Sequence, residues 1–95
     1  MCTILCYAGG AVGPQELRGY LLRARHRGPD DARLVQTPFG WLGFARLAVM
    51  GLTPEGMQPF AQDGSWAACN GELYGFRPLR RELEQKGYRF QSDSD

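Results

Sequence analysis

M-C-T-I-L-C-Y-A, the sequence of residues 1–8, is the segment around which the rest of the chain is arranged. Residues 3–8 are largely apolar, aromatic or β-branched and two glycines follow them, which predicts a buried strand closed by a turn. We expect Met1 to be removed, because a small second residue permits its removal. Cys2 would then carry a nucleophilic thiol and, as a possible base, a free α-amine. On position alone, the alternative stays open that Cys2 is a small apolar residue beginning a strand.

Length and composition indicate one small globular domain. The chain has 95 residues, of which 43% are hydrophobic and 22% charged, so it can bury a modest core. Its net charge of +1 implies no general attraction to nucleic acid or membranes. We find no secretory signal and no segment long enough to span a bilayer, and we expect a soluble cytoplasmic protein. We expect reduced thiols at Cys2, Cys6 and Cys69, whose spacing lacks the second ligand pair of a zinc site.

After the first strand, the sequence predicts a helix. Pro14 suits the first turn of a helix. Apolar side chains recur at helical spacing from Leu17 to Ala24, which indicates one buried face. We expect this helix to end near Arg27, because a Gly-Pro pair follows and the residue before proline is disfavoured in the α conformation.

Three short strands and a second helix are predicted in the remainder. Residues 32–36 and 41–46 read as a hairpin around the turn P-F-G, and residues 65–69 follow the tight-turn signal D-G. A helix is predicted over residues 77–86, ending at a glycine, and residues 88–91 begin another extended segment. We expect the second helix to bury Leu79 and Leu83 and to carry an i, i+4 ion pair between Glu82 and Lys86.

The segment Asn70-Gly71-Glu72 allows two interpretations. Asn-Gly is the preferred centre of a two-residue hairpin turn. Alternatively, a side-chain amide beside an exposed main-chain N–H makes an oxyanion hole, and the glycine lets a substrate approach the main chain closely. Glu72 would then be placed to pair with a substrate ammonium group.

Arg46 and the turn at residues 25–31 are also ambiguous. Arg46 lies within an otherwise apolar run, so it either extends to the surface or binds an anion in a cleft. The turn R-H-R-G-P-D-D places three basic residues before two acids, and we interpret it as a loop that pairs its own charges. We do not expect nucleic-acid binding there, and His26 has no visible partners as a metal ligand or general base.

Taken together and in this order, these motifs resemble the glutamine amidotransferase domain of asparagine synthetases, a class II (N-terminal nucleophile) amidotransferase. The resemblance covers essentially all 95 residues. Its pieces are M-C-T-I at 1–4, R-H-R-G-P-D at 25–30, L-G-F-A-R-L at 42–47, Q-P at 58–59, N-G-E-L-Y at 70–74, L-R-R-E-L at 79–83 and F-Q-S-D-S-D at 90–95.

The resemblance implies an α+β fold: half of the four-layer αββα sandwich of N-terminal-nucleophile enzymes, with antiparallel sheets flanked by helices. It also implies that residues 1–95 are a single, incomplete amidotransferase domain without a synthetase domain. The departures from the family are few. Thr3 and Cys6 stand where glycine is common, and Phe44 and Gly51 replace polar residues.

The activity implied by the resemblance is hydrolysis of L-glutamine through a cysteinyl thioester. Catalytic roles fall on Cys2 and on the oxyanion donors Asn70 and Gly71. Substrate contacts are implied for Arg46, Val49, Asn70, Gly71, Glu72 and Asp95. No metal or cofactor is implied for this step, whereas ATP and Mg²⁺ are expected only in a synthetase domain.

That synthetase domain, or a partner chain, would receive the ammonia and transfer it to an acceptor such as aspartate. The full-length family also suggests a possible homodimer. A second interpretation is a catalytically silent piece of an amidotransferase that binds glutamine or serves in assembly. A third is that the scaffold supplies ammonia to a different acceptor.

Overall fold

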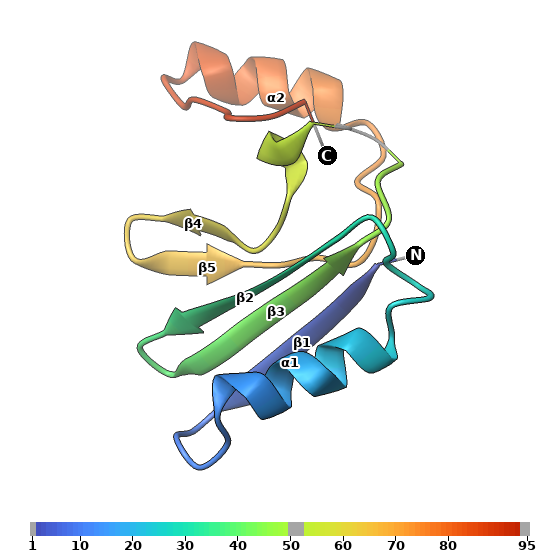
Figure 1. Ribbon diagram of the computed structural model, residues 1–95. Helices are drawn as coiled ribbons and strands as arrows, with labels where there is room; N and C mark the ends of the chain where they lie inside the picture. Colours follow the sequence, from blue (N-terminus) through green and yellow to red (C-terminus); the bar gives the residue numbers. More distant parts are fainter. Residues whose placement is uncertain (1, 50–52, 94–95) are drawn as a thin grey trace.

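The computed structural model describes residues 2–49 and 53–93, which form an α+β domain (Figure 1). Two antiparallel sheets and two α-helices make up its regular structure. This is the predicted fold class. In chain order the elements are β1 (Thr3–Ala8), α1 (Pro14–Arg23), β2 (Asp31–Thr37), β3 (Gly40–Arg46), the 3₁₀-helix η1 (Pro54–Gly56), β4 (Phe60–Gln62), β5 (Ser65–Ala67) and α2 (Phe76–Gln85).

The larger sheet has the strand order β1-β3-β2, with both neighbouring pairs antiparallel. The predicted hairpin supplies β2 and β3, and β1 pairs with the other edge of β3, from Thr3 opposite Ala45 to Ala8 opposite Gly40. Cys2 therefore lies at the end of the sheet where β3 finishes. The strand predicted from the first residues is confirmed over the same range.

Helix α1 covers one face of this sheet, as Figure 1 shows. Leu17 and Leu21 are its buried side chains, which confirms the buried face read from the sequence. The predicted end near Arg27 is wrong, because α1 ends at Arg23 and residues 24–27 form turns before the Gly-Pro pair. Gly43 lets α1 approach closely, because a Cβ at that position would lie 3.2 Å from Leu21 Cδ2. Side chains alternate along β3, so Phe44 points to the opposite face, where it is 1% exposed.

The second half of the chain lies on the face of the sheet opposite α1. The β4–β5 hairpin follows the sheet, and α2 lies beyond the hairpin (Figure 1). The layers thus run helix, sheet, sheet, helix, in the order expected for half of an αββα sandwich. β5 ends two residues earlier than predicted. Its partner β4, which the sequence did not predict, is only three residues long.

The prediction that α2 buries Leu79 and Leu83 is wrong. Leu79 is 45% exposed and no residue of α2 is buried. Helical spacing puts these side chains on one face, but no described element packs over that face closely enough to bury it. The predicted pair between Glu82 and Lys86 is present at 3.3 Å.

Residues 88–93 form no strand but an irregular segment that runs back along α2. Arg80 holds this segment to the helix. Its guanidinium lies over the Phe90 ring, 5.0 Å from the centroid, and donates a hydrogen bond to the Ser92 carbonyl oxygen. No helix in the described part of the chain is long and apolar enough to cross a membrane.

Candidate functional site

The Cys2 thiol is held against the main chain just beyond β3. Leu47 N–H donates to Cys2 Sγ at 3.3 Å, and the thiol lies 3.6 Å from the Leu47 carbonyl oxygen, to which it can donate. The side chain is half-buried. These two contacts fix the direction of the sulfur relative to the end of β3. Leu47 acts through main-chain atoms, so no feature of its side chain could have marked it in the sequence.

Arg46 is buried next to this contact. It is 7% exposed, and its Nη1 donates to the Thr53 carbonyl oxygen at 2.9 Å. The interpretation in which Arg46 extends to the surface is therefore wrong. Because Thr3 pairs with Ala45, the same register places Cys2 opposite Arg46, on one face of the sheet. A thiol and a buried guanidinium thus share the end of the sheet on the face opposite α1.

The turn at residues 25–31 holds the segment that carries Arg46 and Leu47. Asp30 N–H donates to the Arg46 carbonyl oxygen at 2.9 Å, and Asp30 Oδ2 accepts from Ala48 N–H at 2.7 Å. Within the described residues, no ion pair links the acids and bases of this turn. The interpretation of a loop that pairs its own charges is therefore wrong. Asp30 pairs instead with the main chain after β3.

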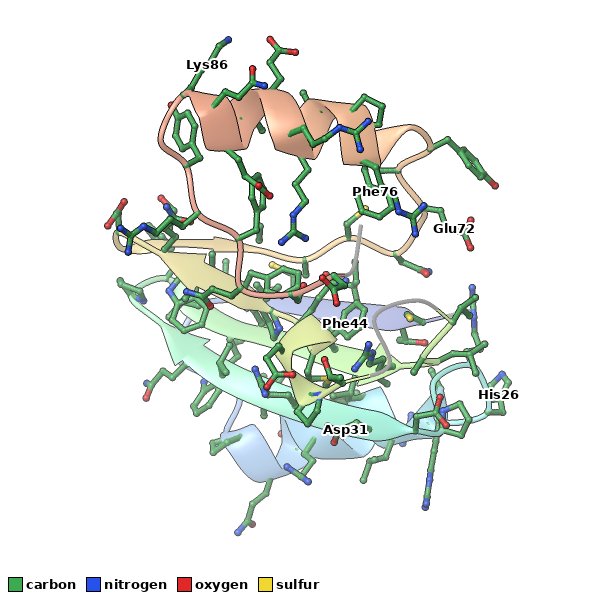
Figure 2. The ribbon with its side chains drawn as sticks, turned by 90° about the horizontal axis from the view of Figure 1, so that it is seen from above. His26, Asp31, Phe44, Glu72, Phe76 and Lys86 are labelled. Atoms are coloured by element: carbon green, nitrogen blue, oxygen red, sulfur yellow. The ribbon has the colours of Figure 1, made fainter. Side chains whose placement is uncertain are left out.

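Close packing of this turn against β3 requires a glycine at position 28. It packs directly on β3, where a Cβ would lie 2.2 Å from the Ala45 carbonyl oxygen and 2.8 Å from Arg46 N. Any side chain at this position would push the turn off the strand. His26 is exposed at the periphery of the molecule (Figure 2).

Asn70 and Gly71 lie in an exposed bend between β5 and α2. They are not the centre of a hairpin, because no strand follows them before α2 begins. The residue before them is fixed by Gln58, whose side-chain Oε1 accepts from Cys69 N–H at 2.6 Å. Glu72 is exposed on the same connection, as Figure 2 shows.

The predicted site residues therefore form two groups. The first contains Cys2 and Arg46, joined through the segment after β3, and the second is the Asn70–Glu72 bend. Both lie at the end of the molecule where the chain begins (Figure 1), but no hydrogen bond between described residues links Cys2 to the bend. Val49 is 68% exposed. Asp95 and Met1 lie outside the described residues.

This end of the molecule thus combines a half-buried thiol with a buried guanidinium, on residues that the sheet register places opposite each other. The three cysteines, Cys2, Cys6 and Cys69, are free thiols. Across residues 2–49 and 53–93 we find no group of three His, Cys, Asp or Glu side chains arranged to hold a metal ion.

Comparison with known proteins gives one family and a consistent set of relatives. The family model described as "Glutamine amidotransferase domain" matches residues 1–95. The chain is 40% identical over 72 residues to "Asparagine synthetase [glutamine-hydrolyzing] 1" of Bacillus subtilis, an alignment covering 74% of this chain and 11% of that protein. It is 38% identical over 102 residues to "Asparagine synthetase [glutamine-hydrolyzing]" of Brassica oleracea, covering 100% of this chain and 17% of the relative.

A third relative gives the same result. A "Probable asparagine synthetase [glutamine-hydrolyzing]" of Acanthamoeba polyphaga mimivirus is 33% identical over 91 residues, covering 87% of this chain and 16% of the relative. The chain thus spans less than a fifth of the length of these relatives. No solved structure matches it.

Proposed function

Because this chain belongs to the glutamine amidotransferase domain family, we propose that it carries the glutamine-hydrolysing site of an asparagine synthetase-like enzyme. The observation that supports this most is the position of Cys2. Its sulfur is held by the Leu47 main chain, and the sheet register places Cys2 opposite Arg46, which is buried. A nucleophile and an anion-binding group at one end of a sheet suit a substrate with an α-carboxylate and a reactive side-chain amide.

The proposed reaction begins once Met1 has been removed. The Cys2 sulfur attacks the side-chain amide carbon of glutamine, and the Cys2 α-amine takes the thiol proton. The tetrahedral intermediate then expels ammonia, which receives that proton, and leaves a glutamyl thioester on Cys2. Water hydrolyses the thioester to glutamate and restores the thiol. Nucleophile and base belong to one residue, so no histidine is needed.

The remaining residues would orient the substrate. Arg46 would pair with the α-carboxylate in the two-point manner that guanidinium groups favour. Asn70 and the Gly71 N–H would stabilise the oxyanion, with such a donor worth about 3 kcal/mol in the transition state. Glu72 and Asp95 would bind the α-ammonium group, and main-chain groups around Val49 would help to hold the substrate. Glutamine would thus bridge the two groups of site residues.

Ammonia released here would pass to an ATP- and Mg²⁺-dependent synthetase domain or partner chain, for transfer to a carboxylate such as that of aspartate. The names of the relatives support this assignment. On this proposal residues 1–95 belong to a single amidotransferase domain that works in the cytoplasm. It needs no cofactor for the glutaminase step, and the full-length family suggests that the enzyme forms a homodimer.

One observation favours a second candidate, a silent glutamine-binding or assembly piece. Helix α2 buries no residue, and Leu79 and Tyr74 are exposed, so the second half of the chain offers apolar surface for assembly. A folded wild-type chain that releases no glutamate would support this candidate and would exclude hydrolysis by the chain alone.

The role of Arg46 is tested by Arg46→Lys, which keeps the charge but loses the planar fork. We expect the KM for glutamine to rise by roughly 10- to 100-fold with a smaller change in kcat, because uniform binding of the substrate is lost. Steady-state glutamate release measures both constants. The increase should disappear with a glutamine analogue that lacks the α-carboxylate. Arg33→Lys, on the neighbouring strand β2, is the control and should behave as wild type.

Gly71→Ala separates a role in catalysis from a role in folding. A Cβ at Gly71 would meet only Cys69 Sγ, at 3.8 Å, which is an ordinary contact, so we expect unchanged thermal stability. We expect kcat to fall roughly 10- to 100-fold, because the methyl group occupies the space in which the oxyanion forms. Gly10→Ala is the control. It has nothing within 4 Å of its Cβ and should change neither the thermal stability nor kcat. Full activity in Gly71→Ala would remove Gly71 from the proposed site.

A further inference from the structure

The Gln58 side chain holds the main chain of Cys69 at two points. Its Oε1 accepts from Cys69 N–H at 2.6 Å, and its Nε2 donates to the Cys69 carbonyl oxygen at 3.2 Å. A side-chain amide suits this role because it carries a donor and an acceptor side by side. Two hydrogen bonds to one residue fix both its position and the direction of its peptide groups.

The register of the small sheet explains this arrangement. β4 and β5 pair from Gln62 opposite Ser65 to Phe60 opposite Ala67. Continued by two residues, this register places Gln58 opposite Cys69. In an antiparallel ladder, the main chain of the neighbour would offer Cys69 one C=O and one N–H. The Gln58 side chain offers the same two groups and thereby extends the ladder past the end of both strands.

The pair of hydrogen bonds between Gln58 and Cys69 is the last contact that fixes the chain before the proposed oxyanion donors. Asn70 and Gly71 follow Cys69 directly and lie in an exposed bend. Among the hydrogen bonds of the described residues, none holds Asn70 or Gly71 themselves. The direction in which the chain leaves Cys69 therefore determines where the two donors point.

We propose that Gln58 is a positioning residue for glutamine hydrolysis, which fixes Cys69 so that Asn70 and Gly71 face the oxyanion of the substrate. This inference rests on the proposed function. Gln58 touches no substrate and acts only through the main chain of Cys69. Because the oxyanion develops only in the transition state, loosening its donors lowers kcat and leaves KM nearly unchanged.

The test compares Gln58→Met, which keeps the length of the side chain but removes both hydrogen bonds, with Gln58→Glu, which keeps only an acceptor. We expect kcat for glutamine to fall about tenfold or more in Gln58→Met, with KM within about twofold of wild type. In Gln58→Glu, kcat should fall less than in Gln58→Met. The matched control is Gln62→Met, in the exposed strand β4, which should behave as wild type.

A second measurement does not need turnover. Backbone NMR relaxation of the 95-residue chain should show larger amplitudes of motion at the Asn70 and Gly71 amides in Gln58→Met and unchanged motion in β1. Faster hydrogen exchange is expected at the Cys69 amide. If Gly71 keeps its wild-type order in Gln58→Met, or if KM rises while kcat stays constant, the positioning role is overturned.

Failure of the proposed function gives a different pattern. If Cys2→Ala still releases glutamate at the wild-type rate, the hydrolysis mechanism is wrong, whereas the relaxation measurement still reports whether Gln58 orders the bend. If Gln58→Met loses its fold, Gln58→Glu decides through the same two readouts. A Gln58→Glu variant with wild-type kcat and wild-type order at Gly71 would then overturn the inference.

Discussion

Cys2→Ala will abolish the release of glutamate from glutamine, with a loss of roughly 10³-fold or more in kcat. Alanine offers no sulfur to form the thioester, and no other nucleophile takes its place in the proposed site. The Cys2 sulfur contacts only the Leu47 main chain among the hydrogen bonds of the described residues. The substitution should therefore leave the fold intact, which circular dichroism and thermal unfolding can verify.

Cys6→Ala is the matched control for this experiment, because it makes the same chemical change at an exposed position within β1. It should retain full activity. Cys2→Ser should remain far below wild type, since a hydroxyl is a weaker nucleophile than a thiol at neutral pH. If Cys2→Ala and wild type released glutamate equally, another residue would have to be the nucleophile.

Gly28→Ala will destabilise the chain by about 3 kcal/mol or more, because overpacking against main-chain atoms cannot be relieved by a side-chain rotation. The new Cβ would lie 2.2 Å from the Ala45 carbonyl oxygen. To avoid this clash, the turn must move away from β3. That movement breaks the hydrogen bonds of Asp30 to Arg46 and Ala48. Urea unfolding measures the loss in the free energy of unfolding.

Activity should fall together with stability in Gly28→Ala, because the displaced turn no longer holds the segment that contacts Cys2. Gly19→Ala is the control. Gly19 lies within α1 with nothing within 4 Å of its Cβ, and alanine there should stabilise the helix by up to about 1 kcal/mol. Equal unfolding midpoints for the two variants would show that the turn does not pack on β3 as described.

Local patterns in the sequence predicted the first half of the fold well. β1 and the β2–β3 hairpin follow from apolar periodicity and from turn residues at their ends, and α1 follows from its apolar spacing although it ends at Arg23, before the predicted end. β4 was missed because three residues after Pro59 are too short to show a pattern. The burial of Leu79 and Leu83 was predicted wrongly, because spacing shows which side chains share a face but not whether another element covers it.

In the candidate site, too, some residues could be predicted from the sequence and others could not. Residue chemistry and the family resemblance singled out Cys2 and Arg46, and the sheet register places these two residues opposite each other. The supporting roles of Asp30 and Gln58 depend on contacts with residues 18 and 11 positions away. Such long-range hydrogen bonds have no local signature, although both residues lie within motifs that carried the resemblance. Structure was needed to show that these motifs hold the main chain.

The proposed mechanism depends on a sulfur that attacks and a terminal nitrogen on the same residue that moves its proton. Intact-protein mass spectrometry of the 95-residue chain, quenched during turnover of glutamine, shows both whether Met1 has been removed and whether the sulfur carries a glutamyl group. We predict a chain that begins at Cys2 and carries one glutamyl group, bound as a thioester to the Cys2 sulfur and absent from Cys2→Ala. A chain that retains Met1 and still releases glutamate at the full rate would contradict it.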